Sequence, residues 1–163
     1  MSTTAVEELE EPPRRELTYE EERGKPMPST NHAIIQSRLT GFFLRHTEFD
    51  IMNELSLRLG GKPVTPDISI YPRKPMDLLN DVIVRTDAPL LTVEILSPTQ
   101  GSSPVLEKVA LYLANGVKSV WLVAPPFRLV TIFTPDGQQR TYHNGVVRDP
   151  AIGVTADLDA IFS

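Results

Sequence analysis

One stretch of the sequence decides the fold: LLTVEILSPTQGSSPVLEKVALYLANGVKSVWLV, residues 90–123. It begins with an apolar segment typical of a buried strand. It ends in SVWLV, part of a continuously apolar run over 119–126 that is typical of a central strand covered on both faces. Between them the sequence predicts a helix with Ser103 as its N-cap, Pro104 at its first position and Gly116 just past its end. The stretch therefore predicts a strand, a helix and a second strand in succession.

The residues upstream of this stretch predict a helix and two more strands. The segment PMPSTNHAIIQSRLTGFFLRHT carries apolar residues at helical spacing, with an N-cap expected among residues 29–31. Two strands are expected at about 51–59 and 67–72, joined in hairpin style by a turn at Gly60 and Gly61. The chain therefore enters the decisive stretch after one helix and two strands.

The flanking segments complete the predicted order of elements. Residues 73–88 are polar and irregular, which predicts a surface loop. Downstream, RLVTIF, TPDG and QQRTYH predict a β-hairpin, and the final TADLDAIFS predicts a short helix. The order is helix, three strands, helix, strand and C-terminal β-hairpin, which indicates an α/β fold with a mixed central sheet.

Length and composition favour one domain with one core, since the chain has 163 residues, of which 40% are hydrophobic. Cysteine is absent, so a metal would have to be held by oxygen or nitrogen ligands. No apolar run is long enough to cross a bilayer, and the N-terminus lacks the pattern of a secretory signal. A cytoplasmic location without membrane contact is therefore expected.

The net charge of -5 is concentrated at the N-terminus. Residues 1–22 hold eight Glu and two Arg, whereas the remaining 141 residues hold 14 basic and 13 acidic residues. Residues 1–18 are acidic and contain proline, so we expect a disordered tail there and a single domain over residues 19–163. The nearly neutral body neither indicates nor excludes a nucleic-acid partner.

Two acidic residues, Asp67 and Glu94, fall in strand segments that otherwise belong to the interior. An unpaired ionised carboxylate in such a place costs several kcal/mol, so it is usually paired, protonated or bound to a cation. Strand alternation puts Asp67 on one face with Ser69 and Tyr71, and Glu94 on one face with Leu96. If the two strands are neighbours, the carboxylates converge and suit a hard cation such as Mg²⁺. Separate structural pairing with Arg or Lys is the alternative.

These segments resemble the PD-(D/E)XK nuclease superfamily and, within it, the Uma-type putative restriction endonuclease family. The resemblance rests on TPDISIY, LTVEILSPTQ and VLEKVALYLANGVKSVWLV, together with TYEEERGKPMPSTNHAIIQ upstream, and runs from about Tyr19 to Phe133. It implies a restriction-endonuclease-like core of helix, three strands, helix and strand. It also implies Mg²⁺- or Mn²⁺-dependent phosphodiester cleavage of nucleic acid, with DNA favoured over RNA, by a homodimer that cuts both strands.

The resemblance also assigns roles to single residues. Asp67 and Glu94 would be metal ligands, and the backbone carbonyl of Ile95 a third. Leu96 stands where the superfamily carries its catalytic lysine, which an aliphatic side chain cannot replace. Either this function has passed to Lys108 on the following helix, where the family carries a lysine, or the chain is a catalytically silent binding protein for nucleic acid or protein. An ordinary solvated lysine is the alternative for Lys108.

Other candidate site residues are less specific. Glu54 matches an acid that often precedes the PD strand in the family, with a surface acid as the alternative. His32 matches a histidine at the start of the family's first helix, and either a phosphate contact or a local cap would explain it. The family's N-terminal acid corresponds to Glu20, Glu21 or Glu22, in an ambiguous register. Cations for phosphate contacts are scattered along the chain: Arg23, Lys25, Arg73 and Lys74.

Two other enzyme classes are disfavoured. The sequence has no G-x-S-x-G motif and no cysteine nucleophile, and no glycine-rich loop opens a helix. Nucleophilic hydrolases and nucleotide-binding folds of these types are therefore not supported, which leaves a metal-dependent nuclease or its silent relative.

Overall fold

The computed structural model describes residues 15–16, 18, 24–98 and 101–163. At its centre lies a six-stranded sheet in the order β1-β4-β6-β7-β8-β9. Its strands are β1 (Phe49–Asn53), β4 (Ile68–Pro72), β6 (Leu91–Ile95), β7 (Ser119–Ala124), β8 (Leu129–Phe133) and β9 (Gln139–Tyr142). Strands β6 and β7 run parallel, whereas the other neighbours are antiparallel. The predicted α/β fold with a mixed sheet and a hairpin after β7 is confirmed.

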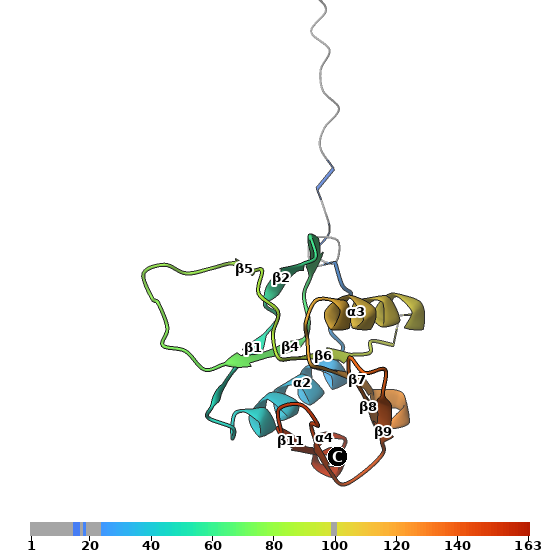
Figure 1. Cartoon of the computed structure of the whole chain (residues 1–163). Helices are drawn as coiled ribbons and strands as arrows, with labels where there is room; N and C mark the ends of the chain where they lie inside the picture. Colours follow the sequence, from blue (N-terminus) through green and yellow to red (C-terminus); the bar gives the residue numbers. More distant parts are fainter. Residues whose placement is uncertain (1–14, 17, 19–23, 99–100) are drawn as a thin grey trace, which may run out of the picture.

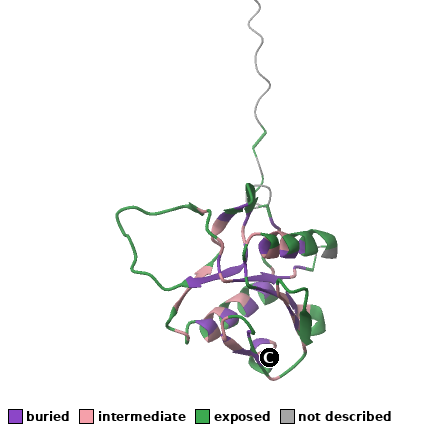
Figure 2. Cartoon of the chain, in the orientation of Figure 1, coloured by how far each residue is buried: buried purple, intermediate pink, exposed green. Residues whose placement is uncertain are grey.

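The two long helices lie on opposite faces of this sheet (Figure 1). Helix α2 (Thr30–Phe43) packs Ile35, Leu39 and Phe43 into the larger apolar cluster, where the Phe43 ring meets Trp121 edge-on at 5.3 Å between ring centroids. Helix α3 (Ser102–Ala114) connects β6 to β7 and packs against the other face. Because both faces are covered, β4, β6 and β7 are buried almost throughout (Figure 2).

The predicted helix termini are confirmed in part. Ser29 caps α2 by accepting a 3.2 Å hydrogen bond from the backbone N–H of His32, as the sequence predicts. Gly116 follows the end of α3 in the left-handed region, with φ +97°. The prediction of Ser103 as the N-cap of α3 is wrong, because the helix begins two residues earlier, with Gly101 as its N-cap. The serine lies inside the first turn instead.

The predicted strand over 51–59 is wrong, because two strands belonging to different sheets occupy this segment. Strand β1 ends at Asn53, and β2 (Ser56–Leu59) begins after a break at Glu54, whose φ is +56°. The glycine turn joins β2 to β3 (Lys62–Val64), not to the strand at 67–72 as expected. Together with β5 (Val84–Arg85), these strands form a small separate sheet in the order β3-β2-β5. Apolar alternation continues across the break, so the sequence pattern hides it.

The C-terminal residues cover the α2 side of the central sheet. After the short 3-10 helix η1 (Pro125–Phe127) and the β8–β9 hairpin come β10 (Val146–Arg148), β11 (Thr155–Asp157) and helix α4 (Leu158–Ile161). Strand β11 and α4 pack beside α2. The predicted short helix is present, whereas the two-stranded β10–β11 sheet was not foreseen. Within the described residues, no helix has the length and apolar character needed to span a membrane.

Candidate metal centre

Asp67 and Glu94 lie side by side at the junction of two neighbouring strands. The register pairs Ile68 with Val93, so Asp67, one residue before β4, stands next to Glu94 near the end of β6. The backbone N–H of Asp67 donates to the Val93 carbonyl at 3.1 Å, and the backbone N–H of Ile95 donates to Asp67 Oδ2 at 2.7 Å. The backbone of β6 therefore orients the Asp67 carboxylate directly.

Two side chains from the N-terminal part of the chain approach the other Asp67 oxygen. Lys25 Nζ lies 2.5 Å from Asp67 Oδ1, and His32 Nε2 lies 3.2 Å from the same atom. Asp67 is only 1% exposed. Neither ring nitrogen of His32 completes a hydrogen bond of good geometry to any described residue. His32 is thus a buried imidazole that approaches Asp67, and its ring nitrogens remain available to bind a ligand.

Electrostatics at this contact favour an ion pair. Burial raises the pKa of Asp67, but the neighbouring His32 and the charge of Lys25 outweigh burial, so the net shift is downward. Burial lowers the pKa of Lys25, but the charge of Asp67 and hydrogen bonds to Asp67 and Glu54 outweigh burial, and the net shift is upward. Both groups are therefore charged near neutral pH.

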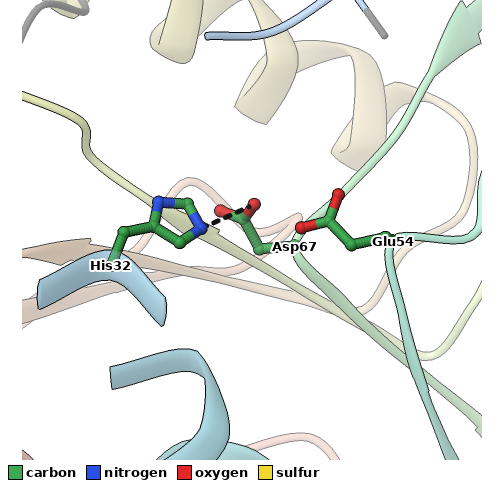
Figure 3. A group of neighbouring side chains, drawn as sticks. All are labelled: His32, Glu54 and Asp67. Carbon is green, nitrogen blue, oxygen red and sulfur yellow. Dashed lines mark ion pairs between the residues drawn. The ribbon is translucent and has the colours of Figure 1, made fainter. Parts of the chain in front are cut away.

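Glu54 completes this side of the site. Its left-handed backbone, between β1 and β2, turns the carboxylate toward Lys25 Nζ, which lies 2.9 Å from Glu54 Oε2. Gln36 on α2 donates from Nε2 to Glu54 Oε1 at 3.3 Å and to the Asp67 carbonyl at 2.9 Å. Figure 3 shows His32, Glu54 and Asp67 directed toward one another from α2, the β1–β2 break and the start of β4.

Glu94 is bonded on the α3 side. The hydroxyl of Tyr112 donates to Glu94 Oε1 at 2.5 Å, and Lys108 Nζ lies 3.6 Å from Glu94 Oε2. Burial and then the charge of Asp67 raise the pKa of Glu94 to about 7, against the opposing effects of Lys108 and Tyr112. Burial and Glu94 also hold the pKa of Tyr112 well above 10. Asp67 is therefore charged at neutral pH, whereas the pKa of Glu94 lies close to neutrality.

These residues surround a hollow of about 10 Å³, close to the space that one water or ion occupies. Asp67, Glu94, Ile95, His32, Lys25 and Lys108 are among the residues that line it. One ligand atom each from His32, Glu54 and Asp67 lie within 4.8 Å of one another. Carboxylate oxygens with one imidazole nitrogen are a donor set that can hold a divalent metal ion.

The structure brings together all five side chains named as candidates from the sequence: His32, Glu54, Asp67, Glu94 and Lys108. It also places Leu96 in partial exposure just after β6, with its backbone N–H bonded to Val123. The side chain of Lys108 is 19% exposed and beside Glu94, so it is not an ordinary solvated lysine. Glu20, Glu21 and Glu22 lie outside the described residues.

Lys25 is the site residue that sequence reasoning assigned only to scattered positive charge. It comes from the segment just before α2, and the Gly24 and Pro26 on either side of it give no local sign of burial. Arg73, another of the cations expected to contact phosphate, does not reach the site. It follows Asp67 by six residues along an extended strand, which is about 20 Å. The only sequence signal for Lys25 was its short distance from His32 along the chain.

The fold and this carboxylate cluster define the chain as a nuclease-fold protein. A crystal structure from Anabaena variabilis, described as a putative nuclease belonging to DUF820, has the same fold, with a TM-score of 0.72 and 24% sequence identity. The match covers 84% of this chain and 83% of that chain. No curated protein matches the sequence.

The family model for Uma2, described as a putative restriction endonuclease, matches residues 5–158. The chain therefore belongs to the Uma2 family, as its sequence segments indicate.

Proposed function

We propose that this protein is a metal-dependent endonuclease that hydrolyses phosphodiester bonds in nucleic acid, with DNA as the preferred substrate. One observation carries the proposal: two carboxylates, Asp67 and Glu94, and two lysines, Lys25 and Lys108, line one small hollow in a chain of the Uma2 family. Carboxylates that hold a cation beside ammonium groups are suited to phosphodiester hydrolysis.

The proposed metal ligands are Asp67, Glu94 and the backbone carbonyl of Ile95, with Glu54 and His32 as further donors next to Asp67. Bound Mg²⁺ or Mn²⁺ would supply a water of lowered pKa and positive charge against the scissile phosphate. The Ile95 N–H orients the Asp67 carboxylate and the Tyr112 hydroxyl orients the Glu94 carboxylate, whereas Lys25 Nζ would have to move away from Asp67 Oδ1 for a metal to bind there.

The lysines take over the role of the residue that Leu96 replaces. Lys108 Nζ reaches Glu94 from α3 and is partly exposed, so it can contact both the attacking water and a phosphate oxygen. Lys25 Nζ pairs with Asp67 and Glu54 and stays protonated at neutral pH, because its pKa is raised. The positive charge of the site thus comes from Lys25 and Lys108, which lie on other segments, because leucine stands at the lysine position after β6.

A second candidate function is a catalytically silent nuclease-fold protein that binds nucleic acid or protein. It is favoured by the contacts of Lys25, because an ammonium group 2.5 Å from Asp67 and 2.9 Å from Glu54 already compensates both carboxylates. In that protein Lys25 would permanently take the place of the metal.

The discriminating experiment is cleavage of supercoiled plasmid and of single-stranded DNA and RNA with Mg²⁺ or Mn²⁺. Asp67→Asn should abolish metal-stimulated cleavage, and Lys108→Ala should reduce it by at least tenfold. Lys118→Ala is the matched control, because Lys118 is exposed at the opposite end of β6, where its backbone N–H binds the Leu90 carbonyl. Cleavage that survives Asp67→Asn would refute the site, and no cleavage of any substrate would favour the silent protein.

The proposed enzyme acts as a homodimer, so that each copy cuts one strand of a duplex. If both strands of a plasmid are cut during one binding event, linear DNA should form directly, and this result would support the homodimer. Nicked circles alone would indicate that copies act one at a time.

A further inference from the structure

The loop between β4 and β5 exposes an unusual run of apolar side chains. We call residues 73–83 the arm. Its apolar members are Met76, Leu78, Leu79, Val82 and Ile83, of which Leu79 is 93% and Ile83 85% exposed. Figures 1 and 2 show the arm standing away from the central sheet, exposed along its length. Five exposed apolar side chains gathered in one loop are more than the scattered single exposures normal for a protein surface, and such a group is a candidate interaction site. The surface loop expected over 73–88 is present, interrupted by β5, and it exposes these apolar side chains beside its polar ones.

Local hydrogen bonds order the middle of the arm, and further contacts lie at its foot. Asp77 Oδ1 accepts bonds from the backbone N–H groups of Leu79 and Asn80, both at 3.1 Å. At its foot, Arg85 donates to the two oxygens of Asp87 at 2.9 and 2.5 Å and stacks on the Tyr71 ring, 3.8 Å from the centroid. Each of these contacts lowers the conformational entropy that the arm loses when a partner covers it.

The same region carries both a projection and a hollow. A hollow of about 550 Å³ lies against the arm, and its apolar lining includes Met52, Leu55, Met76, Val82 and Val84. Leu78, Leu79 and Ile83 do not line this hollow. These three side chains therefore belong to the outer side of the arm. A surface with both a projection and a receiving hollow is complementary to a second copy of itself, as a two-fold interface requires.

Charge along the arm points to the same partner. Asp77 and Asp81 lie near its middle and end, whereas Arg73 and Lys74 lie at its start. Two arms packed antiparallel would set the acidic part of each against the basic part of the other. A nucleic acid would meet as many acids as bases on this surface, and so would gain little from binding it.

We propose that the arm is the contact through which two copies of this chain associate, with Leu78, Leu79 and Ile83 of each copy filling the hollow of the other. This inference specifies the surface of the homodimer in the proposed function. Its evidence is the exposure, order and self-complementarity of the arm, which do not depend on catalysis.

Sedimentation velocity of the full chain tests the association directly. The wild type should sediment as a dimer at tens of micromolar, and Leu79→Asp and Ile83→Asp should each raise the dissociation constant at least tenfold. Phe127→Asp is the matched control, because Phe127 is also highly exposed, at 73%, but lies on η1 and not on the arm. A monomeric wild type at 100 µM, or a dimer that both arm variants leave intact, would overturn the proposal.

Disulfide trapping tests the geometry, and the absence of native cysteine makes it clean. Leu79→Cys protein mixed with Thr86→Cys protein should form a mixed disulfide dimer under mild oxidation, because Thr86 lines the hollow. Phe127→Cys mixed with Thr86→Cys should not. Both readouts are independent of cleavage. Dimers without nuclease activity would refute the proposed cleavage and leave the arm contact standing, whereas active monomers that make only nicked circles would refute the arm and the homodimer and leave the metal-dependent cleavage standing.

Discussion

At the residue scale, Glu54 shows how the site and the fold are coupled. A non-glycine residue in the left-handed region costs about 1 kcal/mol or more, and Glu54 at φ +56° accepts that cost while aiming its carboxylate at Lys25. The strain is at the point where β1 leaves the central sheet. The backbone that breaks the strand thus also supplies a proposed ligand.

Replacing Glu54 by glycine should separate stability from activity. Glu54→Gly relieves about 1 kcal/mol of backbone strain and loses a partly exposed ion pair worth about 0 to 1 kcal/mol, so the free energy of unfolding should change by less than about 1 kcal/mol. Metal-stimulated cleavage should nevertheless fall, as an activity assay beside urea denaturation would show. Glu54→Ala, which keeps the strain, should be about 1 kcal/mol less stable than Glu54→Gly. Full activity in either variant would remove Glu54 from the site.

Glu94 makes a pH-dependent contribution to stability. Its pKa of about 7 in the fold exceeds its ordinary value of 4.5, so the folded state binds its proton more tightly than the unfolded chain does. Stability should therefore fall as pH rises from about 4.5 to 7 in the presence of EDTA. The lowered pKa of Asp67 acts at more acidic pH, below its ordinary 3.8.

Urea denaturation of the wild type and of Glu94→Gln at pH 5 and pH 8 measures this effect. The variant should lose most of the difference in unfolding free energy between the two pH values, because glutamine does not titrate. An equally large difference in Glu94→Gln would assign the pH dependence to another group.

At the element scale, helix α3 brings two side chains of the site to Glu94. It is the crossover between the parallel strands β6 and β7, and it carries Lys108 and Tyr112 one helical turn apart on the side that faces Glu94. Its end at Gly116 sets where β7 begins. The position of the lysine therefore depends on how α3 stops.

Alanine at two glycines should have opposite effects on stability. Gly116→Ala places a side chain at φ +97°, which should cost about 1 to 2 kcal/mol of unfolding free energy, although its Cβ would meet Ala88 only at an ordinary 3.9 Å. Gly41→Ala in the last turn of α2, where an added Cβ meets nothing within 4 Å, should stabilise by up to about 1 kcal/mol. Thermal melts of both variants test this, and the same sign for both would contradict it.

At the scale of the whole molecule, charge is divided between the N-terminal residues and the body. Residues 1–18 contain five Glu and two Arg, and we expect them to compete with nucleic acid for the cations of the site. Their removal should raise affinity for DNA at low salt, and the gain should shrink at high salt because screening weakens both effects.

Fluorescence anisotropy with a labelled duplex measures the effect of this deletion. A full-length variant with glutamine at residues 7, 8, 10 and 11 is the matched control and should reproduce most of the gain. Affinity that the deletion leaves unchanged at low salt would show that these residues do not compete.

The sequence alone determined the order of elements around β6, α3 and β7, because long apolar runs and helix punctuation are local signals. It also singled out Asp67 and Glu94, since a carboxylate in an apolar strand is conspicuous without any structure. The break at Glu54 escaped it, because a left-handed glutamate has no local sequence signature and the apolar alternation runs on into β2.

Only the tertiary structure decided which cations meet the two acids. Lys25 and Lys108 lie 42 residues before Asp67 and 14 residues after Glu94 along the chain, and no periodicity relates them. Their convergence depends on the antiparallel pairing of β4 with β6 and on α3 crossing that face of the sheet. The same is true of the arm, whose residues look like an ordinary loop until packing leaves its apolar side chains uncovered. Local sequence specifies elements, but contacts between distant segments exist only once those elements pack.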